Sequence, residues 1–387
     1  MRTLGKWLGR ILLSLALAAV LIGIWKREEI MRLWAVNSLF AEEKIVSNFS
    51  HMDDAFLTKS LPRGDGPVSP LPEGDTTQLP ETAADWIKDR AMTSLLVMKD
   101  GSIRYEEYFL GTTPDDRRIS WSIAKSYLSA LFGVLLDEGA IGSLDDPVTQ
   151  YAPQLVGTAY DGASIRNVLN MASGVIFDED YHDPDSDINR MGRIVALGGT
   201  LDDFTASFND RFSDPGLSWK YVSIDTHVIG MVIRGATGRS VSDLLAEKII
   251  HPLGQEQDGY YLTDGAGVAF VLGGLNMTTR DYARFGQMYL QNGMWNGTQI
   301  VPSDWVAAST VPSANTAVGD TQYGYQWWMP ADAREGEYFA RGIYGQYVYV
   351  NRATNTVIAV NSADRLFRED GAFDQNLAAM RAIANAN

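Results

Sequence analysis

The stretch Ser120-Trp121-Ser122-Ile123-Ala124-Lys125-Ser126-Tyr127 places a hydroxyl and an amine three residues apart. Residues at i and i+3 share one face of a helix, so a helix here brings Ser122 and Lys125 into contact. A serine becomes nucleophilic when a neighbouring base takes its proton, and a lysine can be that base when burial lowers its pKa. Residues 122–136 are apolar on most sides, which predicts a buried helix in which Lys125 meets that condition.

The Ser-x-x-Lys spacing is a weak motif by itself, because about one such match is expected by chance in a chain of this length. The alternative interpretation is a helix-capping serine followed by a surface lysine. Two observations favour a functional pair. Lys125 is the only lysine in the chain with a serine three residues earlier, and it lies near the start of the most apolar helix, where a solvated lysine is not expected.

Outward from this helix, the pattern predicts strands at both ends of a domain and helices between them. Asp100-Gly101 joins two β-rich runs and is a strong hairpin signal. The block 144–272 carries helical patterns and Gly/Asp/Pro-rich loops with few convincing strands, and 373–383 predicts a closing amphipathic helix. Four strands are expected in two hairpins, 92–98 with 103–109 and 346–350 with 357–360.

The residues around Ser122 resemble the nucleophile box of the class C β-lactamase-like and penicillin-binding-protein-type serine hydrolases. The resemblance covers about 93–362 and is closest to the branch of 6-aminohexanoate-dimer hydrolase and its carboxylesterase relatives. It implies an α+β fold of the β-lactamase/transpeptidase-like type, in which helices flank an antiparallel sheet and the active-site cleft faces a mostly helical lobe. Other stretches resemble the family in the same order: LDDPV at 144–148, NVLNMASG at 167–174, GGLNMT at 273–278 and YGYQWW at 323–328.

The second box of such enzymes is Tyr-x-Asn, and this chain has Tyr221-Val222-Ser223. The resemblance gives Tyr221 the role of proton shuttle, because a phenol can protonate the leaving group and then help activate water. Ser223 replaces the amide that helps to hold the acyl side chain, which counts against an efficient β-lactamase. Tyr181 is similar to a tyrosine that closes over the substrate amide in the dimer hydrolase branch, so it is a candidate substrate-binding residue.

The third box is normally Lys-Thr-Gly or His-x-Gly, whereas this chain has Ala340-Arg341-Gly342. In the family, the basic group binds the carboxylate of penicillins and peptidoglycan stems, so its absence weakens both substrate assignments. The resemblance implies that the backbone N–H of Ile343 joins that of Ser122 in an oxyanion hole, which depends on main-chain geometry and tolerates side-chain change. Gly342 and Gly345 are candidate substrate-binding positions beside it.

These residues predict a serine hydrolase that cleaves esters or small amides through an acyl-enzyme on Ser122, with Lys125 and Tyr221 as acid–base groups. A β-lactamase or D-alanyl-D-alanine peptidase stays open. So does a non-catalytic envelope binding protein on the same fold, although such a scaffold does not need a buried lysine beside a serine. A Ser-His-Asp mechanism is disfavoured because no Gly-x-Ser-x-Gly elbow exists. The histidines it would need are His51, His182, His227 and His251.

The composition excludes further classes of function. The 387 residues include 48 acidic and 32 basic side chains, a net charge of −16, with no basic block interleaved with aromatics, so nucleic acid is not an expected partner. Zero cysteines exclude a disulfide framework and a cysteine nucleophile. The four histidines are not clustered at ligand spacing, so neither a metal nor another cofactor is expected. Nothing in the sequence indicates an oligomeric state.

The N-terminus predicts a membrane anchor over 1–27. Arg2, Lys6 and Arg10 precede the apolar run 11–25, which is bracketed by tryptophans. The positive charge before the run places the N-terminus inside, so the expected location is the bacterial inner membrane, single-pass, with the catalytic domain on the periplasmic side. A cleaved secretory signal is the alternative.

Two further regions follow the predicted anchor. The region 28–80 is expected to be a lead-in that packs on the main domain and then an extended connector, because 61–80 holds five prolines and three glycines. The serine hydrolase domain is expected over 81–387.

Overall fold

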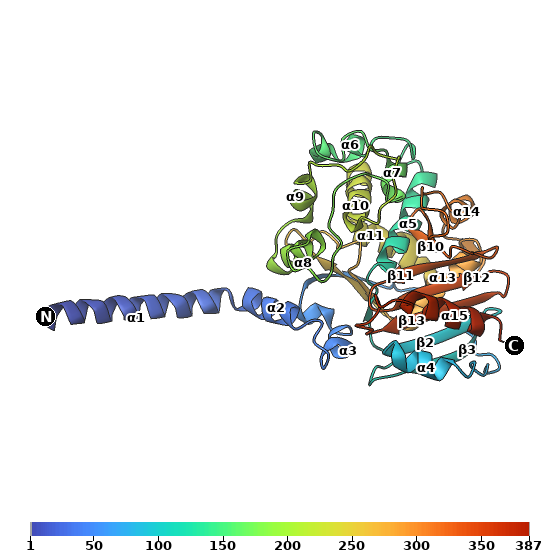
Figure 1. Ribbon diagram of the computed structural model, residues 1–387, viewed down its shortest axis with the longest axis horizontal. Helices are drawn as coiled ribbons and strands as arrows, with labels where there is room; N and C mark the ends of the chain where they lie inside the picture. Colours follow the sequence, from blue (N-terminus) through green and yellow to red (C-terminus); the bar gives the residue numbers. More distant parts are fainter. Residues whose placement is uncertain (1, 387) are drawn as a thin grey trace.

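The computed structural model describes residues 2–386, and its largest sheet is built from both ends of the domain (Figure 1). Seven antiparallel strands lie in the order β3-β2-β13-β12-β11-β10-β9. The two predicted hairpins are its β2–β3 and β12–β13 pairs. Asp100 and Gly101 both have positive φ, as a tight hairpin turn requires. The strands are β2 (Met92–Lys99), β3 (Ser102–Tyr108), β9 (Gln322–Gly324), β10 (Trp327–Met329), β11 (Glu337–Gly342), β12 (Gln346–Asn351) and β13 (Thr356–Ser362).

Helices cover both faces of this sheet. Side chains alternate between the faces along each strand, so one strand contributes apolar side chains to both layers. In β2, Leu95 and Val97 pack with α4 (Ala83–Asp89) and α15 (Ala372–Ala384), whereas Leu96 and Met98 belong to the main core. On that second face lie α5 (Ile123–Asp137) and α13 (Thr279–Leu290). The predicted buried helix and the predicted closing helix are α5 and α15. The antiparallel sheet flanked by helices confirms the predicted fold class.

A mostly helical lobe lies beside the upper end of α5 in Figure 1. Its longest helix, α10 (Ser223–Thr237), packs against α5. Apart from the two N-terminal helices, the other helical segments are α3 (Ile45–Asn48), α6 (Val148–Tyr151), α7 (Ile165–Leu169), α8 (Asp187–Leu197), α9 (Leu201–Ala206), α11 (Val241–Leu245), α12 (His251–Leu253), α14 (Ser303–Ser309), the 3₁₀ turns Met52–Asp54 and Pro153–Leu155, and the π-helical turn Ala246–Ile250.

A second, four-stranded sheet in the order β1-β5-β6-β4 joins segments that are distant in sequence. β5 lies inside the block expected to hold few strands, and it pairs along its full length with β1 from the lead-in. Leu39, Phe49 and Met52 are buried in the main core, so the lead-in folds with the catalytic body. The strands are β1 (Leu57–Leu61), β4 (Arg118–Ile119), β5 (Gly259–Thr263) and β6 (Leu275–Met277), and a separate hairpin holds β7 (Met294–Trp295) and β8 (Thr298–Gln299).

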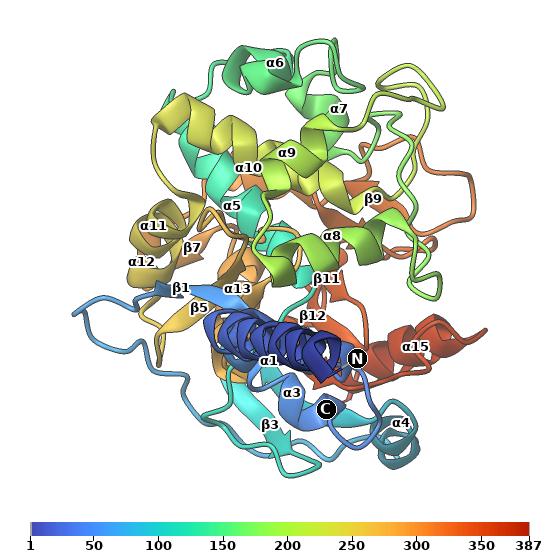
Figure 2. The same cartoon turned by 90° about the vertical axis from the view of Figure 1, so that its left-hand side faces the viewer.

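The N-terminal helix α1 (Arg2–Trp25) projects from the body and continues, after a bend, into α2 (Arg27–Asn37) (Figures 1 and 2). Within residues 2–386, no helix is long and apolar enough to cross a membrane alone. Residues 9–25 and α2 meet that requirement only as a pair, with a 71° bend between them. The membrane anchor over 1–27 therefore stays a prediction.

Candidate active site

Ser122 lies at the entry to α5, where the chain turns sharply from strand to helix. β4 ends at Ile119 and α5 begins at Ile123, so three residues make the turn. Trp121 adopts φ of 44°, a left-handed conformation that is uncommon for a large side chain. This turn places Ser122 at the wall of a cavity of about 430 Å³.

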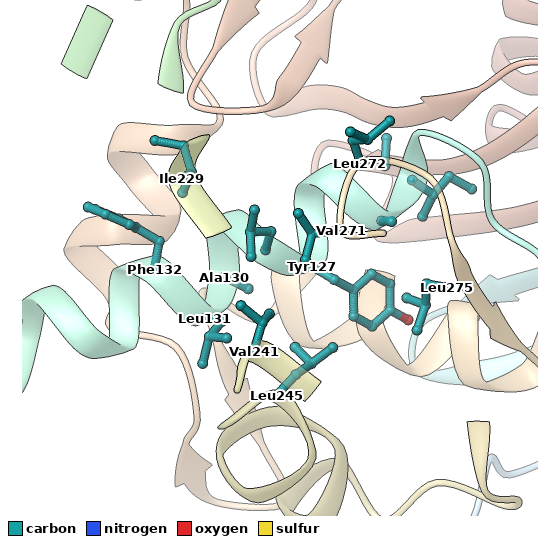
Figure 3. Close-up of a cluster of buried hydrophobic side chains, with 14 of the residues drawn as sticks. Tyr127, Ala130, Leu131, Phe132, Ile229, Val241, Leu245, Val271, Leu272 and Leu275 are labelled. Carbon is teal, nitrogen blue, oxygen red and sulfur yellow. The ribbon is translucent and has the colours of Figure 1, made fainter. Parts of the chain in front are cut away.

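Lys125 lies one turn further along α5 and is only 2% exposed. Its Nζ donates a hydrogen bond to the carbonyl oxygen of Leu272 at 2.8 Å and lies 3.4 Å from Oγ of Ser223. The surroundings of α5 are apolar, as Figure 3 shows for the helix and Leu272. Burial lowers the pKa of Lys125 to about 7, and the negative charges of Glu179 and Asp225 oppose this effect. The amine can therefore be neutral near neutral pH.

Tyr221 lies just before α10, and its ring centroid is 5.5 Å from Nζ of Lys125. Its ring packs against Trp328 at 5.2 Å. Burial is the largest cause that raises the pKa of Tyr221, and Glu179 raises it further, whereas hydrogen bonding with Ser122 lowers it. The phenol therefore stays protonated over the physiological range and can donate a proton near Ser122.

Ser223 begins α10 and joins the lysine to a carboxylate that the sequence analysis did not assign. The backbone N–H of Ser223 donates a hydrogen bond to Oε1 of Glu179, and the phenol of Tyr181 donates to Oε2 at 3.1 Å. Burial raises the pKa of Glu179, while the Lys125 charge lowers it. Glu179 lies in an acidic stretch, and the sequence gives no signal that separates it from its exposed neighbours.

Asp225 is a second unassigned carboxylate, and it is fully buried two residues into α10. It accepts hydrogen bonds from the hydroxyls of Tyr160 at 2.7 Å and Ser173 at 2.8 Å. Burial raises its pKa to about 7. In sequence it looks like an ordinary acidic residue of a first helical turn. Its negative charge raises the pKa of Lys125 and so opposes the effect of burial.

The third box forms a tight turn from β11 to β12 that lies against the nucleophile turn. A Cβ added at Gly342 would lie 2.5 Å from the carbonyl oxygen of Ser120, so this position requires glycine. Tyr344 and Gly345 have positive φ. Ile343 lines the same cavity as Ser122, so the close approach at Gly342 brings the two expected oxyanion donors to one place.

Gln346, which the sequence analysis did not assign, fixes this turn from inside the protein. Its buried side-chain amide donates to the carbonyl oxygens of Tyr344 at 3.0 Å and Ser362 at 2.7 Å. Its amide oxygen accepts from Nδ2 of Asn361 at 3.0 Å. The turn that carries Ile343 is therefore held by side-chain hydrogen bonds as well as by the β-ladder.

An aromatic cluster connects the lead-in to both halves of the site. Phe40 stacks on Tyr344 with ring centroids 5.0 Å apart, and Phe49 contacts Trp121 edge-on at 5.5 Å. Trp121 precedes Ser122, and Tyr344 follows Ile343. The lead-in was expected to pack on the main domain, and it does so on the residues next to the nucleophile and next to the expected oxyanion donor. The sequence carries no signal for that location.

Four of the eight predicted site residues line the cavity, and Tyr221 is not among them. Ser122, Tyr181, Ser223 and Ile343 line it, and Lys125 contacts Ser223 from behind the wall. Gly342 and Gly345 lie in the turn next to Ile343 and are not lining residues. Among the histidines of the rival mechanism, only His182 lines the cavity, whereas His227 pairs with Asp202 at 2.7 Å.

Known proteins resemble this chain over most of its length. The sequence profile of the Beta-lactamase family matches residues 83–380. The 6-aminohexanoate-dimer hydrolase of Paenarthrobacter ureafaciens is 29% identical over 328 residues, covering 80% of this chain and 83% of that protein.

Solved structures share the fold. One from Bacillus anthracis, assigned provisionally as a 6-aminohexanoate-dimer hydrolase, superposes with a TM-score of 0.80 at 24% identity, covering 89% of this chain and 95% of its own. A D-stereospecific amidohydrolase from Streptomyces sp. superposes with a TM-score of 0.60 at 20% identity, covering 78% and 98%.

Proposed function

Because the chain belongs to the Beta-lactamase family and is an amidase/esterase-type serine hydrolase, we propose that Ser122 attacks the carbonyl carbon of an ester or small amide. The observation that carries the proposal is the position of Lys125. A lysine that is 2% exposed, one helical turn from a serine at a cavity wall, has a pKa of about 7 and is suited to accept a proton.

The reaction begins when neutral Lys125 takes the proton of Ser122 as Oγ bonds to the carbonyl carbon. The backbone N–H groups of Ser122 and Ile343 stabilise the negative charge that develops on the carbonyl oxygen. Tyr221, protonated because burial raises its pKa, donates a proton to the departing alkoxide or amine. Water then attacks the acyl-enzyme and gives a proton to the Tyr221 phenolate, while protonated Lys125 returns a proton to Oγ of Ser122. The acid product leaves and the enzyme regains its starting protonation.

The substrate class is an ester or a small linear amide. Ala340 occupies the place where family members that bind penicillins carry a cation, and it is buried. Ser223 occupies the place of the asparagine that helps to hold an acyl amide. Tyr181 lines the cavity and is suited to contact a substrate amide. The relative that cleaves the 6-aminohexanoate dimer supports small linear amides as a second substrate type.

We also propose that residues 1–27 attach the enzyme to the bacterial inner membrane, with the catalytic body on the periplasmic side. The exposed apolar surface of α1, which projects from the body, supports attachment (Figure 1). Fractionation of the full-length chain tests this point, because a soluble product shortened near residue 20 would instead indicate a cleaved signal.

The nucleophile is tested with a fluorophosphonate and intact-protein mass measurement. The wild-type chain is expected to gain one phosphonyl adduct and to hydrolyse p-nitrophenyl butyrate. Ser122→Ala should lose both and keep its melting temperature, because the hydroxyl serves the reaction and not the packing. Ser126→Ala is a matched control on the same helix, since its hydroxyl donates to Gln326 inside the core. Unchanged turnover in Ser122→Ala would disprove the assignment.

A further inference from the structure

The cavity beside Ser122 has one wall from the N-terminal segment and another from α8. Val36, Leu39 and Phe40 line the first wall. Ile188 and Met191 of α8 line the second, and α2 packs against α8. Figure 2 shows α8 above the N-terminal helices on the face from which α1 projects. The cavity therefore lies where the N-terminal segment meets the helical lobe.

The lining of this cavity is mostly aliphatic and aromatic. Its volume of about 430 Å³ is in the usual range for a small-molecule site. Arg193 and His182 are its basic side chains, and no carboxylate occurs among the described residues that line it. The nearest carboxylate is that of Glu179, which lies behind the wall and accepts hydrogen bonds from two lining residues, Ser223 and Tyr181. An apolar chain in the cavity would be stabilised by transfer from water.

The apolar surface continues outside the cavity along α2. Met31 is 56% exposed and Trp34 is 76% exposed, and α2 ends at Asn37, which lines the cavity. Large apolar side chains that are exposed to solvent next to a cavity are typical of a contact surface for an apolar partner. Their position places that surface between the projecting α1 and the entrance to the site.

We infer that the cavity binds a long apolar chain of the ester or amide substrate, with the reacting carbonyl at Ser122 and the chain between the N-terminal segment and α8. This inference rests on the proposed function and names the substrate class for that site. A substrate with such a chain could reach the site from solution or from a bilayer in contact with α2. The experiments below distinguish these two sources.

The first measurement compares dissolved p-nitrophenyl esters from butyrate to decanoate with the full-length chain. We expect kcat/KM to rise by about fourfold for each added CH₂ until the cavity is filled, the factor that corresponds to about 0.8 kcal/mol of transfer free energy. A flat chain-length profile would overturn the inference.

Gly192 gives a direct test of the cavity wall. It lines the cavity, and a Cβ added there meets no atom within 4 Å, so a larger side chain can extend into open space without a backbone clash. Gly192→Leu should lower the ratio of the decanoate to the butyrate kcat/KM by about 10-fold or more, as expected for two or more displaced methylenes. Gly66→Leu is the matched control, because its added Cβ is equally free and lies outside the cavity. An unchanged ratio in Gly192→Leu would contradict the inference.

The second measurement separates the sources of the chain. p-Nitrophenyl decanoate is supplied either dissolved or preloaded into vesicles of phosphatidylethanolamine and phosphatidylglycerol. We expect faster turnover from vesicles, and a loss of this advantage in the Met31→Ser/Trp34→Ser double variant. Equal rates would exclude the bilayer as the source. Fluorophosphonate labelling of Ser122 is measured in every sample, so failure of the chain-length effect with intact labelling refutes only this inference, whereas absent labelling refutes the proposed function.

Discussion

The ε-amino nitrogen of Lys125 donates a hydrogen bond to the carbonyl oxygen of Leu272 at 2.8 Å. This acceptor fixes the amine without giving it a direct counter-ion, and the carboxylates of Glu179 and Asp225 act on it through space. A direct ion pair would hold the lysine protonated, whereas burial beside a neutral acceptor lowers its pKa. The arrangement is suited to a base that must release and accept protons near neutral pH.

The pH dependence of catalysis should therefore follow Lys125. Below its pKa of about 7 the lysine is protonated and cannot accept the proton of Ser122, so kcat/KM should fall as pH decreases through about 7. Above that value kcat/KM should reach a plateau that holds up to pH 10, because burial raises the pKa of Tyr221 above its ordinary value of 10.0. The profile is measured with p-nitrophenyl butyrate from pH 5 to 10. A rate that is constant from pH 5 to 8 would contradict Lys125 as the base.

Removal of either acid–base group should reduce turnover without loss of the fold. Lys125→Ala and Tyr221→Phe are each expected to lower kcat/KM by about 100-fold or more. Tyr105→Phe is a matched control for the phenol, because Tyr105 pairs with the exposed Glu107 on β3. Steady-state kinetics measures the loss of turnover, and circular dichroism checks that the fold is kept. Near wild-type rates in both variants would show that the proton takes another path.

Gly342→Ala tests the contact between the two turns of the site. The new Cβ would lie 2.5 Å from the carbonyl oxygen of Ser120, so one of the two chain segments must shift. A misplacement of the oxyanion donors by about 1 Å can cost on the order of 100-fold in rate. We expect a large fall in kcat with a smaller change in KM, and Gly66→Ala, where the Cβ meets no atom within 4 Å, should behave as wild type. A fully active Gly342→Ala enzyme would show that the contact is not needed.

Truncation from the N-terminus should separate the anchor from the folded body. A chain that lacks residues 1–27 should be soluble and active on p-nitrophenyl butyrate. A chain that lacks residues 1–61 should unfold at a lower temperature and lose activity, because it also loses β1 and the contact of Phe49 with Trp121. Melting temperature and activity of both forms are compared. Full activity of the shorter form would contradict a structural role for the lead-in.

Local signals explain why much of the fold could be predicted from the sequence. The β2–β3 hairpin depends on Asp100-Gly101, which adopts the positive φ values that this dipeptide favours. The helix α5 depends on an apolar run that contains no proline. β5 was missed because it forms by pairing with β1, about 200 residues earlier, and short runs carry little pattern of their own. Pairing between segments this far apart in sequence produces no hydrophobic periodicity within either segment.

The site residues also fall into those that local sequence predicts and those that depend on distant partners. The spacing of Ser122 and Lys125 places both on one helix, so sequence alone indicates their proximity. Gln346 and Asp225 acquire their roles only through burial and through partners from distant segments, such as Tyr160, 65 residues before Asp225. A single sequence contains no signal for such contacts. Side chains that position the site are therefore harder to predict than those expected to react.

The substrate class can be tested with a β-lactam, because two features of the site disfavour it. Ala340 and Ser223 replace a cation and an amide, and a lost charged hydrogen bond costs about 1.5–3 kcal/mol. Arg341 follows Ala340, and its charge reaches the site only far enough to lower the pKa of Tyr221 against the larger effect of burial. Its guanidinium lies 4.6 Å over the ring of Phe373 in α15, and its cross-strand partner Tyr347 belongs to the core on that side of the sheet.

The expected result is feeble nitrocefin turnover, roughly 100-fold or more below that of p-nitrophenyl butyrate in kcat/KM, because about 1.4 kcal/mol corresponds to a factor of ten. Simple esters lack the carboxylate and so lose nothing comparable. A wild-type nitrocefin kcat/KM equal to or above that for the butyrate ester would overturn the substrate class, while Ser122 would remain the nucleophile.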